Sequence, residues 1–310
     1  MTYSKRTYVY KTVQDCQIQA DVYRSPGEER RPAILWIHGG ALIFGNRTIL
    51  PPEQMELYLT AGYTVVSIDY RLAPETKLQL ILEDVQDAYY WVRRQGPELF
   101  NVDPDHLAVM GHSGGGFLTL MAGFIVHPRP KALVSFYGYG DIVGEWYSRP
   151  DPHYNEEPAV SPEVARQGVS GPVITGGQFV DFPEQRWLFY LFCRQQGLWP
   201  KEVTGFDPHT EPRTFERFCP IRNVTQDYPP TLLLHGDKDT DVPFELSKQM
   251  AAALKENHVL HRLITMEGFG HGFDFSSDGL LEGEPIGLKH PKVAEAFDAV
   301  LAFLNEQMGR

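Results

Sequence analysis

The chain has 310 residues, of which 42% are hydrophobic and 22% charged, and its formal net charge is −12. This composition is typical of a globular protein and excludes a disordered or fibrous one, and the negative charge argues against nucleic acid or an anionic membrane as a partner. Three widely spaced cysteines form no C-x-x-C pair, which favours reduced thiols over a disulfide framework or a metal site. No apolar leader and no apolar run of about 18 residues are present, so we expect a soluble, cytoplasmic protein.

The first half of the chain alternates strand and helix patterns. Alternating apolar residues around a turn at Gln14 and Asp15 predict an antiparallel hairpin over residues 8–23. Continuous apolar runs, which indicate strands buried on both faces, then alternate with apolar residues at helical spacing. The predicted elements are strands at 33–37, 64–68, 107–110 and 131–136 and helices at about 52–61 and 78–95, the second helix being stopped by Gly96 and Pro97.

A segment rich in proline and aromatic residues, 141–228, interrupts this alternation. Its one clear helix, 183–196, is apolar almost all round and must therefore be buried on more than one side. The strand–helix pattern then resumes, with strands at 231–234 and 262–266 and helices at about 244–256 and 291–308. We therefore predict a single α/β domain over residues 1–310, in which a mostly parallel, doubly wound sheet follows an N-terminal antiparallel hairpin and 141–228 form an aromatic-rich, cap-like insertion.

One strand runs into the sequence Gly111-His112-Ser113-Gly114-Gly115. This G-x-S-x-G pattern is typical of a nucleophile elbow, a sharp turn that exposes a serine hydroxyl at the end of a sheet. Glycines two residues before and two residues after the serine avoid collisions across so tight a turn. The pattern predicts Ser113 as a nucleophile, which needs a base and an acid to activate it.

Candidate acids and bases follow the two late strands, in the Ser…Asp…His order that an elbow requires. His271 lies between glycines in a loop that can present its ring, and it is the preferred base. Asp239 is the preferred acid, and Asp237 and Asp241 are interpreted as carboxylates that cap the loop. We expect His38 to brace its own loop.

An oxyanion hole needs backbone N–H groups that point at the developing negative charge. Gly39 and Gly40, after the first buried strand, let the backbone approach a substrate closely, and Gly114 follows the nucleophile at the start of a helix. We predict these three residues as the donors. The composition and spacing suggest no cluster of metal ligands.

Five motifs together resemble the α/β-hydrolase carboxylesterases of the hormone-sensitive-lipase-like group. They are His38-Gly39-Gly40, Asp69-Tyr70-Arg71-Leu72-Ala73-Pro74-Glu75, Gly111 to Gly115, His235-Gly236-x-x-Asp239-x-x-Val242-Pro243 and Gly270-His271-Gly272. The resemblance implies the α/β-hydrolase fold, hydrolysis of carboxylic esters by Ser113, His271 and Asp239, no cofactor, and a mainly structural role for 69–75. Ala41 stands where many members have a third glycine, and the acid motif is similar to that of feruloyl-type, carbohydrate-ester and formamide-cleaving hydrolases.

The sequence thus predicts a serine esterase whose partner is a small-molecule ester of small to medium acyl or aryl groups. A formamidase or carbohydrate-ester deacetylase on the same scaffold is the enzymatic alternative, and a ligand-binding protein of this fold is the non-enzymatic one. We expect the substrate pocket to be formed by Leu42, Phe44, Trp146, Phe182, Trp187 and Phe273.

Overall fold

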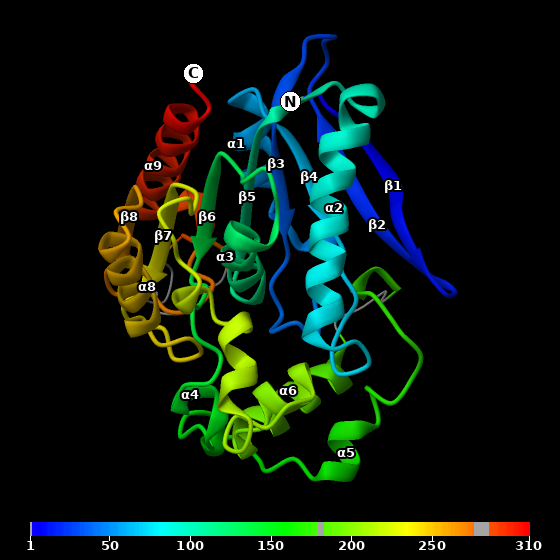
Figure 1. Cartoon of the computed structure of the whole chain (residues 1–310), viewed down its shortest axis with the longest axis vertical. Helices are drawn as coiled ribbons and strands as arrows, with labels where there is room; N and C mark the ends of the chain where they lie inside the picture. Colours follow the sequence, from blue (N-terminus) through cyan, green and yellow to red (C-terminus); the bar gives the residue numbers. More distant parts are fainter. Residues whose placement is uncertain (1, 179–182, 276–284) are drawn as a thin grey trace.

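A computed structural model describes residues 2–178, 183–275 and 285–310. Within these residues, eight strands form one sheet in the order β1-β2-β4-β3-β5-β6-β7-β8 (Figure 1). The hairpin of β1 and β2 pairs antiparallel with β4, and all later pairs are parallel, as the sequence predicts. The strands are β1 (Ser4–Val13), β2 (Cys16–Arg24), β3 (Arg31–Ile37), β4 (Thr64–Ile68), β5 (Val102–His112), β6 (Ala132–Phe136), β7 (Thr231–Gly236) and β8 (His261–Met266).

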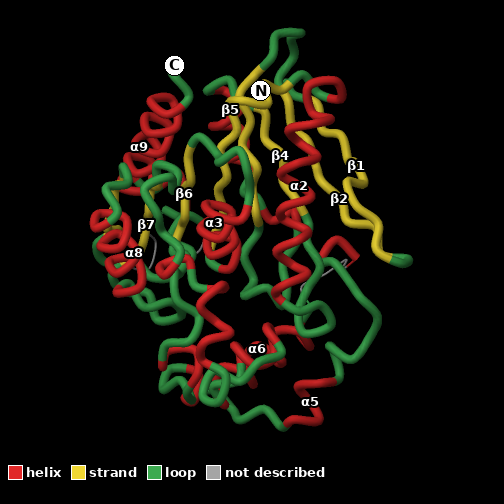
Figure 2. The backbone as a smooth tube through the Cα atoms, viewed as in Figure 1, coloured by secondary structure: helices red, strands yellow, loops and turns green. Residues whose placement is uncertain are grey.

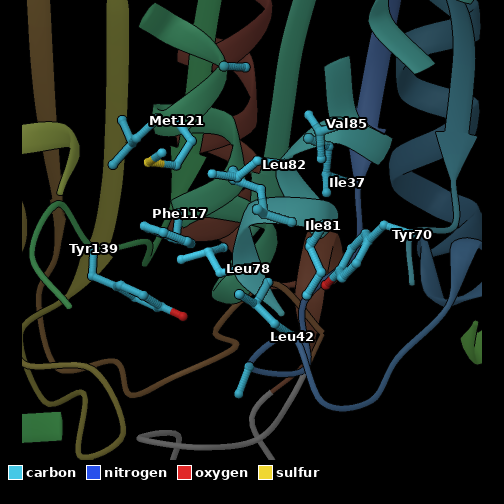
Figure 3. Close-up of a cluster of buried hydrophobic side chains, with 14 of the residues drawn as sticks. Ile37, Leu42, Tyr70, Leu78, Ile81, Leu82, Val85, Phe117, Met121 and Tyr139 are labelled. Carbon is cyan, nitrogen blue, oxygen red and sulfur yellow. The ribbon is translucent and has the colours of Figure 1, made fainter. Parts of the chain in front are cut away.

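Helices cover both faces of the sheet, which explains why the central strands are apolar without alternation. Along β3, Ile34 and Trp36 face one hydrophobic cluster, whereas Leu35 and Ile37 face the other. Figure 3 shows the second of these clusters, in which residues of several elements pack together between Tyr70 and Tyr139. One face carries α1 (Pro52–Thr60) and α9 (Pro291–Gln307), and the other carries α2 (Leu78–Leu99), α3 (Gly114–Ile125) and α8 (Glu245–Glu256).

The predicted end of α2 at Gly96 and Pro97 is wrong, because the helix continues to Leu99. A proline inside a helix removes one hydrogen bond, and only two residues follow Pro97 before the end of the helix. Gly96 has a packing role instead, since a Cβ there would lie 2.6 Å from Val102 Cγ2. Among the described residues, even this long helix lacks the apolar length needed to cross a bilayer.

The residues between β6 and β7 form a separate group of short helices at one end of the sheet (Figures 1 and 2). The helices of this group are α4 (Glu145–Ser148), α5 (Pro162–Arg166), α6 (Glu184–Gln196) and α7 (Trp199–Thr204). The sequence predicts α6 almost to the residue, and Gly197 ends it with a left-handed φ of 68°.

One face of α6 attaches this group to the loops that follow β3 and β4. Arg186, which is buried, donates to Ile43 O at 2.5 Å and to Ala73 O at 2.6 Å, and its guanidinium pairs with Glu75 at 2.8 and 2.9 Å. Two of these partners, Ala73 and Glu75, belong to the 69–75 motif. The motif therefore has a structural task, which is to hold α6 against the sheet.

We expect Arg186→Met to destabilise the protein by about 3–5 kcal/mol, because it leaves Glu75 buried without its charge partner. The free energy of unfolding in urea measures the loss. Arg149→Met is the matched control, since Arg149 forms an exposed i,i+4 pair with Glu145 and such pairs contribute less than about 1 kcal/mol. An Arg186→Met variant as stable as this control would contradict the anchoring role.

Candidate active site

Ser113 occupies the turn between β5 and α3 in a strained backbone conformation. Its φ of 53° lies in the left-handed region, which a residue with a side chain adopts rarely. The turn is crowded, since a Cβ on Gly111 would lie 2.6 Å from Ile37 O and one on Gly115 would collide with the same oxygen. The glycines at these two positions therefore let the turn close and hold the serine hydroxyl at the end of the sheet.

The structure brings Ser113, His271 and Asp239 together from the loops after β5, β8 and β7. The Oγ of Ser113 lies 3.0 Å from Nε2 of His271, and Nδ1 of the same ring lies 2.7 Å from Oδ2 of Asp239. These two contacts fit a neutral imidazole in which Nδ1–H donates to the carboxylate and the serine hydroxyl donates to Nε2. This arrangement can move a proton from the serine to the imidazole.

The side chain of Asp239 is completely buried but has enough hydrogen bonds to remain ionised. Its Oδ1 accepts the N–H groups of Asp241 and Val242 at 2.9 and 2.8 Å, and its Oδ2 also lies 3.0 Å from His235 Nε2. Burial opposes the charged form, but His271 and the hydrogen bonds from His235 and His271 outweigh it and lower the pKa of Asp239.

His235 is a site residue for which the sequence analysis proposed no role. Its Nδ1 lies 2.7 Å from Ser247 Oγ, which fixes the ring so that Nε2–H faces Asp239 and the carbonyl of Val242. The signal was present in the sequence, because His235 opens the motif that contains Asp239. Its role depends on the contact with Ser247 of α8, which no local pattern reveals.

The three predicted oxyanion donors lie beside Ser113. A Cβ on Gly39 would lie 2.9 Å from His112 O, and one on Gly114 would lie 3.1 Å from Ala41 N, so the loop after β3 packs directly on the elbow. Gly39, Gly40 and Ala41 line the same cavity as Ser113. Ala41 has a positive φ of 51° and belongs to this loop, although it is not a glycine.

His38 braces this loop, as the sequence analysis expects. Its Nδ1 lies 2.7 Å from Gly39 O, its ring stacks on Tyr70 at 4.1 Å, and the Tyr70 hydroxyl donates to His38 O at 3.1 Å. Burial lowers the pKa of His38 from 6.5 to about 4, although the hydrogen bond to Gly39 O favours the protonated ring. His38 is therefore neutral at physiological pH.

A cavity of about 970 Å³ opens onto Ser113 and His271. Of the aromatic residues expected in its wall, Phe44 and Trp187 line it. Phe182 lies outside the described residues. Further wall residues that the sequence analysis missed are His112, His153, Tyr154, Tyr190, Asp241 and Phe275.

Leu42, Trp146 and Phe273 do not belong to the cavity wall, so the expectation for them is wrong. Leu42 packs into the core near Leu78 and Ile81 (Figure 3), and Phe273 packs in the cluster on the opposite face of the sheet. Trp146 stacks on Tyr147 at 3.7 Å. Leu42 and Phe273 thus point toward packing partners on other elements, whereas Trp146 packs on its neighbour in the sequence.

The two aspartates interpreted as caps of the acid loop have different environments. Asp237 Oδ1 accepts the N–H of Gly268 at 2.7 Å, which fits that role. Asp241 lines the cavity instead, and its Oδ2 lies 3.4 Å from His271 Nε2. Within the described residues, no group of three or more His, Cys, Asp and Glu side chains is arranged to hold a metal ion.

Comparison with known proteins gives two family matches. Residues 20–151 match the family model BD-FAE, and residues 186–309 match the prolyl oligopeptidase family. The first match contains the loop after β3 and the elbow, and the second contains most of α6 as well as Asp239 and His271.

Individual relatives agree with these matches. The chain is 29% identical to a non-reducing polyketide synthase, atr1 of Stereocaulon alpinum, over 92% of its own length, and 28% identical to the esterase LipC of Mycobacterium tuberculosis, also over 92%. It spans only 13% of the synthase and 61% of LipC. An α/β-hydrolase superfamily protein from Enterococcus faecalis has the same fold, with a TM-score of 0.72 at 23% identity over 98% of this chain and 100% of that one.

The depressed pKa of His38 links stability to pH. Between about pH 6.5 and pH 4 the unfolded chain protonates this histidine while the folded chain does not, so stability falls as the pH falls. We expect His38 to account for about 3 kcal/mol of the loss in unfolding free energy across this range.

Urea unfolding at several pH values tests this linkage. The decline toward acid pH should be shallower in His38→Gln than in the wild type, and the exposed His258→Gln variant should follow the wild type. Equal slopes for all three proteins would show that His38 is not held neutral by the fold.

Proposed function

We propose that the chain is a serine hydrolase of the α/β-hydrolase superfamily, in the hormone-sensitive-lipase-like group, and that it cleaves carboxylic esters through an acyl-enzyme on Ser113. The observation that carries the proposal is the 3.0 Å contact between Ser113 Oγ and His271 Nε2. A serine hydroxyl is a weak nucleophile at neutral pH, and a base at this distance removes its proton as it attacks.

In the proposed reaction, Ser113 Oγ attacks the ester carbonyl carbon and its proton passes to His271 Nε2. Asp239, ionised because its pKa is lowered, stabilises the imidazolium through Nδ1–H. The backbone N–H groups of Gly39, Gly40 and Gly114 donate hydrogen bonds to the carbonyl oxygen as it becomes negatively charged. The imidazolium then protonates the leaving alcohol, and water releases the acyl group by the same steps.

The cavity supports a substrate of small to medium size. Its volume of about 970 Å³ lies at the upper end of the range of about 300–1,000 Å³ typical of small-molecule sites. We infer further that residues 141–228 act as a cap, since Tyr154, Trp187 and Tyr190 of this segment supply part of the wall.

The proposal predicts that the wild-type protein hydrolyses 4-nitrophenyl acetate, butyrate and octanoate at rates that Ser113→Ala lowers by at least about 10⁴-fold. Release of 4-nitrophenol measures the rates. The control is Ser170→Ala, which removes an exposed serine hydroxyl outside the cavity wall and should retain the wild-type rates.

Parallel assays with an N-formyl arylamine and an acetylated sugar separate the esterase from its alternatives. Turnover of either compound much faster than of every aryl ester would replace the proposed substrate class while keeping the mechanism. Ester turnover that survives in Ser113→Ala would refute the mechanism.

A further inference from the structure

Asp241 carries a carboxylate that the proposed mechanism does not use. It is the only Asp, Glu, Lys or Arg among the described residues that line the cavity. The walls beside it are aromatic, with the rings of Phe44, Trp187 and Tyr190 within 5.6 to 6.0 Å of one another. The cavity therefore presents one negative charge in an otherwise uncharged aromatic setting.

The two oxygens of this carboxylate have unequal surroundings. Oδ1 accepts three hydrogen bonds, from the hydroxyls of Tyr154 and Tyr190 at 2.7 and 2.5 Å and from Arg194 Nη1 at 2.6 Å. Within the described part of the chain, Oδ2 has one polar neighbour, His271 Nε2 at 3.4 Å. Oδ1 is thus saturated and holds the carboxylate rigidly, while Oδ2 keeps capacity for a further partner.

Arg194 does not cancel the charge that the cavity sees. It is almost fully buried behind Tyr154 and Tyr190, and its guanidinium pairs with Asp151 as well as with Asp241. One arginine between two carboxylates leaves one negative charge in excess. Burial opposes ionisation of Asp241, but His271 and Arg194 lower its pKa, so the group is ionised at neutral pH.

The position of Oδ2 identifies the part of the substrate that it faces. His271 Nε2 must donate to the oxygen of the leaving alcohol, so that oxygen comes within about 3 Å of Nε2 during the reaction. Asp241 Oδ2 lies 3.4 Å from the same nitrogen. A group attached two or three bonds beyond the leaving oxygen is therefore within reach of Asp241 and the aromatic rings.

We propose that Asp241 and the surrounding rings form a subsite for a positively charged ammonium group on the alcohol side of the ester. The inference rests on the proposed hydrolysis of esters at Ser113 and specifies its substrate class as esters of amino alcohols. A fixed carboxylate attracts the cation, and aromatic faces favour an alkylated ammonium. An anionic group at the same place is repelled.

An isosteric pair of esters tests the subsite. Acetylcholine and 3,3-dimethylbutyl acetate have the same shape and differ only in the charge at one atom. We expect the wild-type protein to hydrolyse acetylcholine with a kcat/KM at least about tenfold higher. Asp241→Asn should bring this ratio close to one, whereas Asp237→Asn, on the same loop but outside the cavity wall, should retain it.

The ratio also separates the subsite from a role for Asp241 in stabilising the imidazolium of His271. Such a role would lower both rates in Asp241→Asn by the same factor and leave the ratio unchanged, which would overturn the proposal. A ratio near one in the wild type would overturn it too.

If Asp241→Asn does not fold, inhibition of the wild type decides the question. Choline should compete with 4-nitrophenyl acetate at a lower concentration than 3,3-dimethylbutan-1-ol, and equal inhibition would refute the subsite. Hydrolysis of 4-nitrophenyl acetate tests the proposed function independently of the subsite. If the wild-type protein hydrolyses neither this ester nor the isosteric pair, the proposed function itself fails.

Discussion

The contact between the loop after β3 and the turn after β5 is the constraint on which the site depends. At this contact two stretches of backbone approach so closely that Cβ atoms on Gly39, Gly111 or Gly115 would meet carbonyl oxygens. The crowding holds Ser113 at a φ of 53° and sets the loop of Gly39 and Gly40 against it. A single packing contact therefore positions both Ser113 and the loop of Gly39 and Gly40.

Helix α6 connects this contact to the acid loop. Arg186, Tyr190 and Arg194 are spaced four residues apart and therefore share one face of the helix. Arg186 binds the loops after β3 and β4, whereas Tyr190 and Arg194 bind Asp241, two residues from Asp239. A single buried face thus joins the segment between β6 and β7 to both sides of the site.

The sequence predicted the strands of the sheet and its long helices, but not the short helices α4, α5 and α7. It also identified the residues that meet at Ser113, because these lie at strand ends in a parallel sheet. It could not predict features that depend on side-chain direction across the fold. The apolar pattern of α6 indicated burial but concealed the function of its two arginines. Likewise Asp237 and Asp241 look equivalent in the loop after β7, and contacts with residues distant in sequence, such as the tyrosines of a segment more than fifty residues earlier, distinguish them.

The central claim is that Ser113 is the nucleophile that His271 activates, and covalent labelling tests it most directly. The protein should react with an alkyl fluorophosphonate to give a single adduct, which peptide mass spectrometry assigns to Ser113. The adduct should be absent in Ser113→Ala and should form much more slowly in His271→Ala. A label on another residue, or labelling at an undiminished rate without His271, would contradict the account.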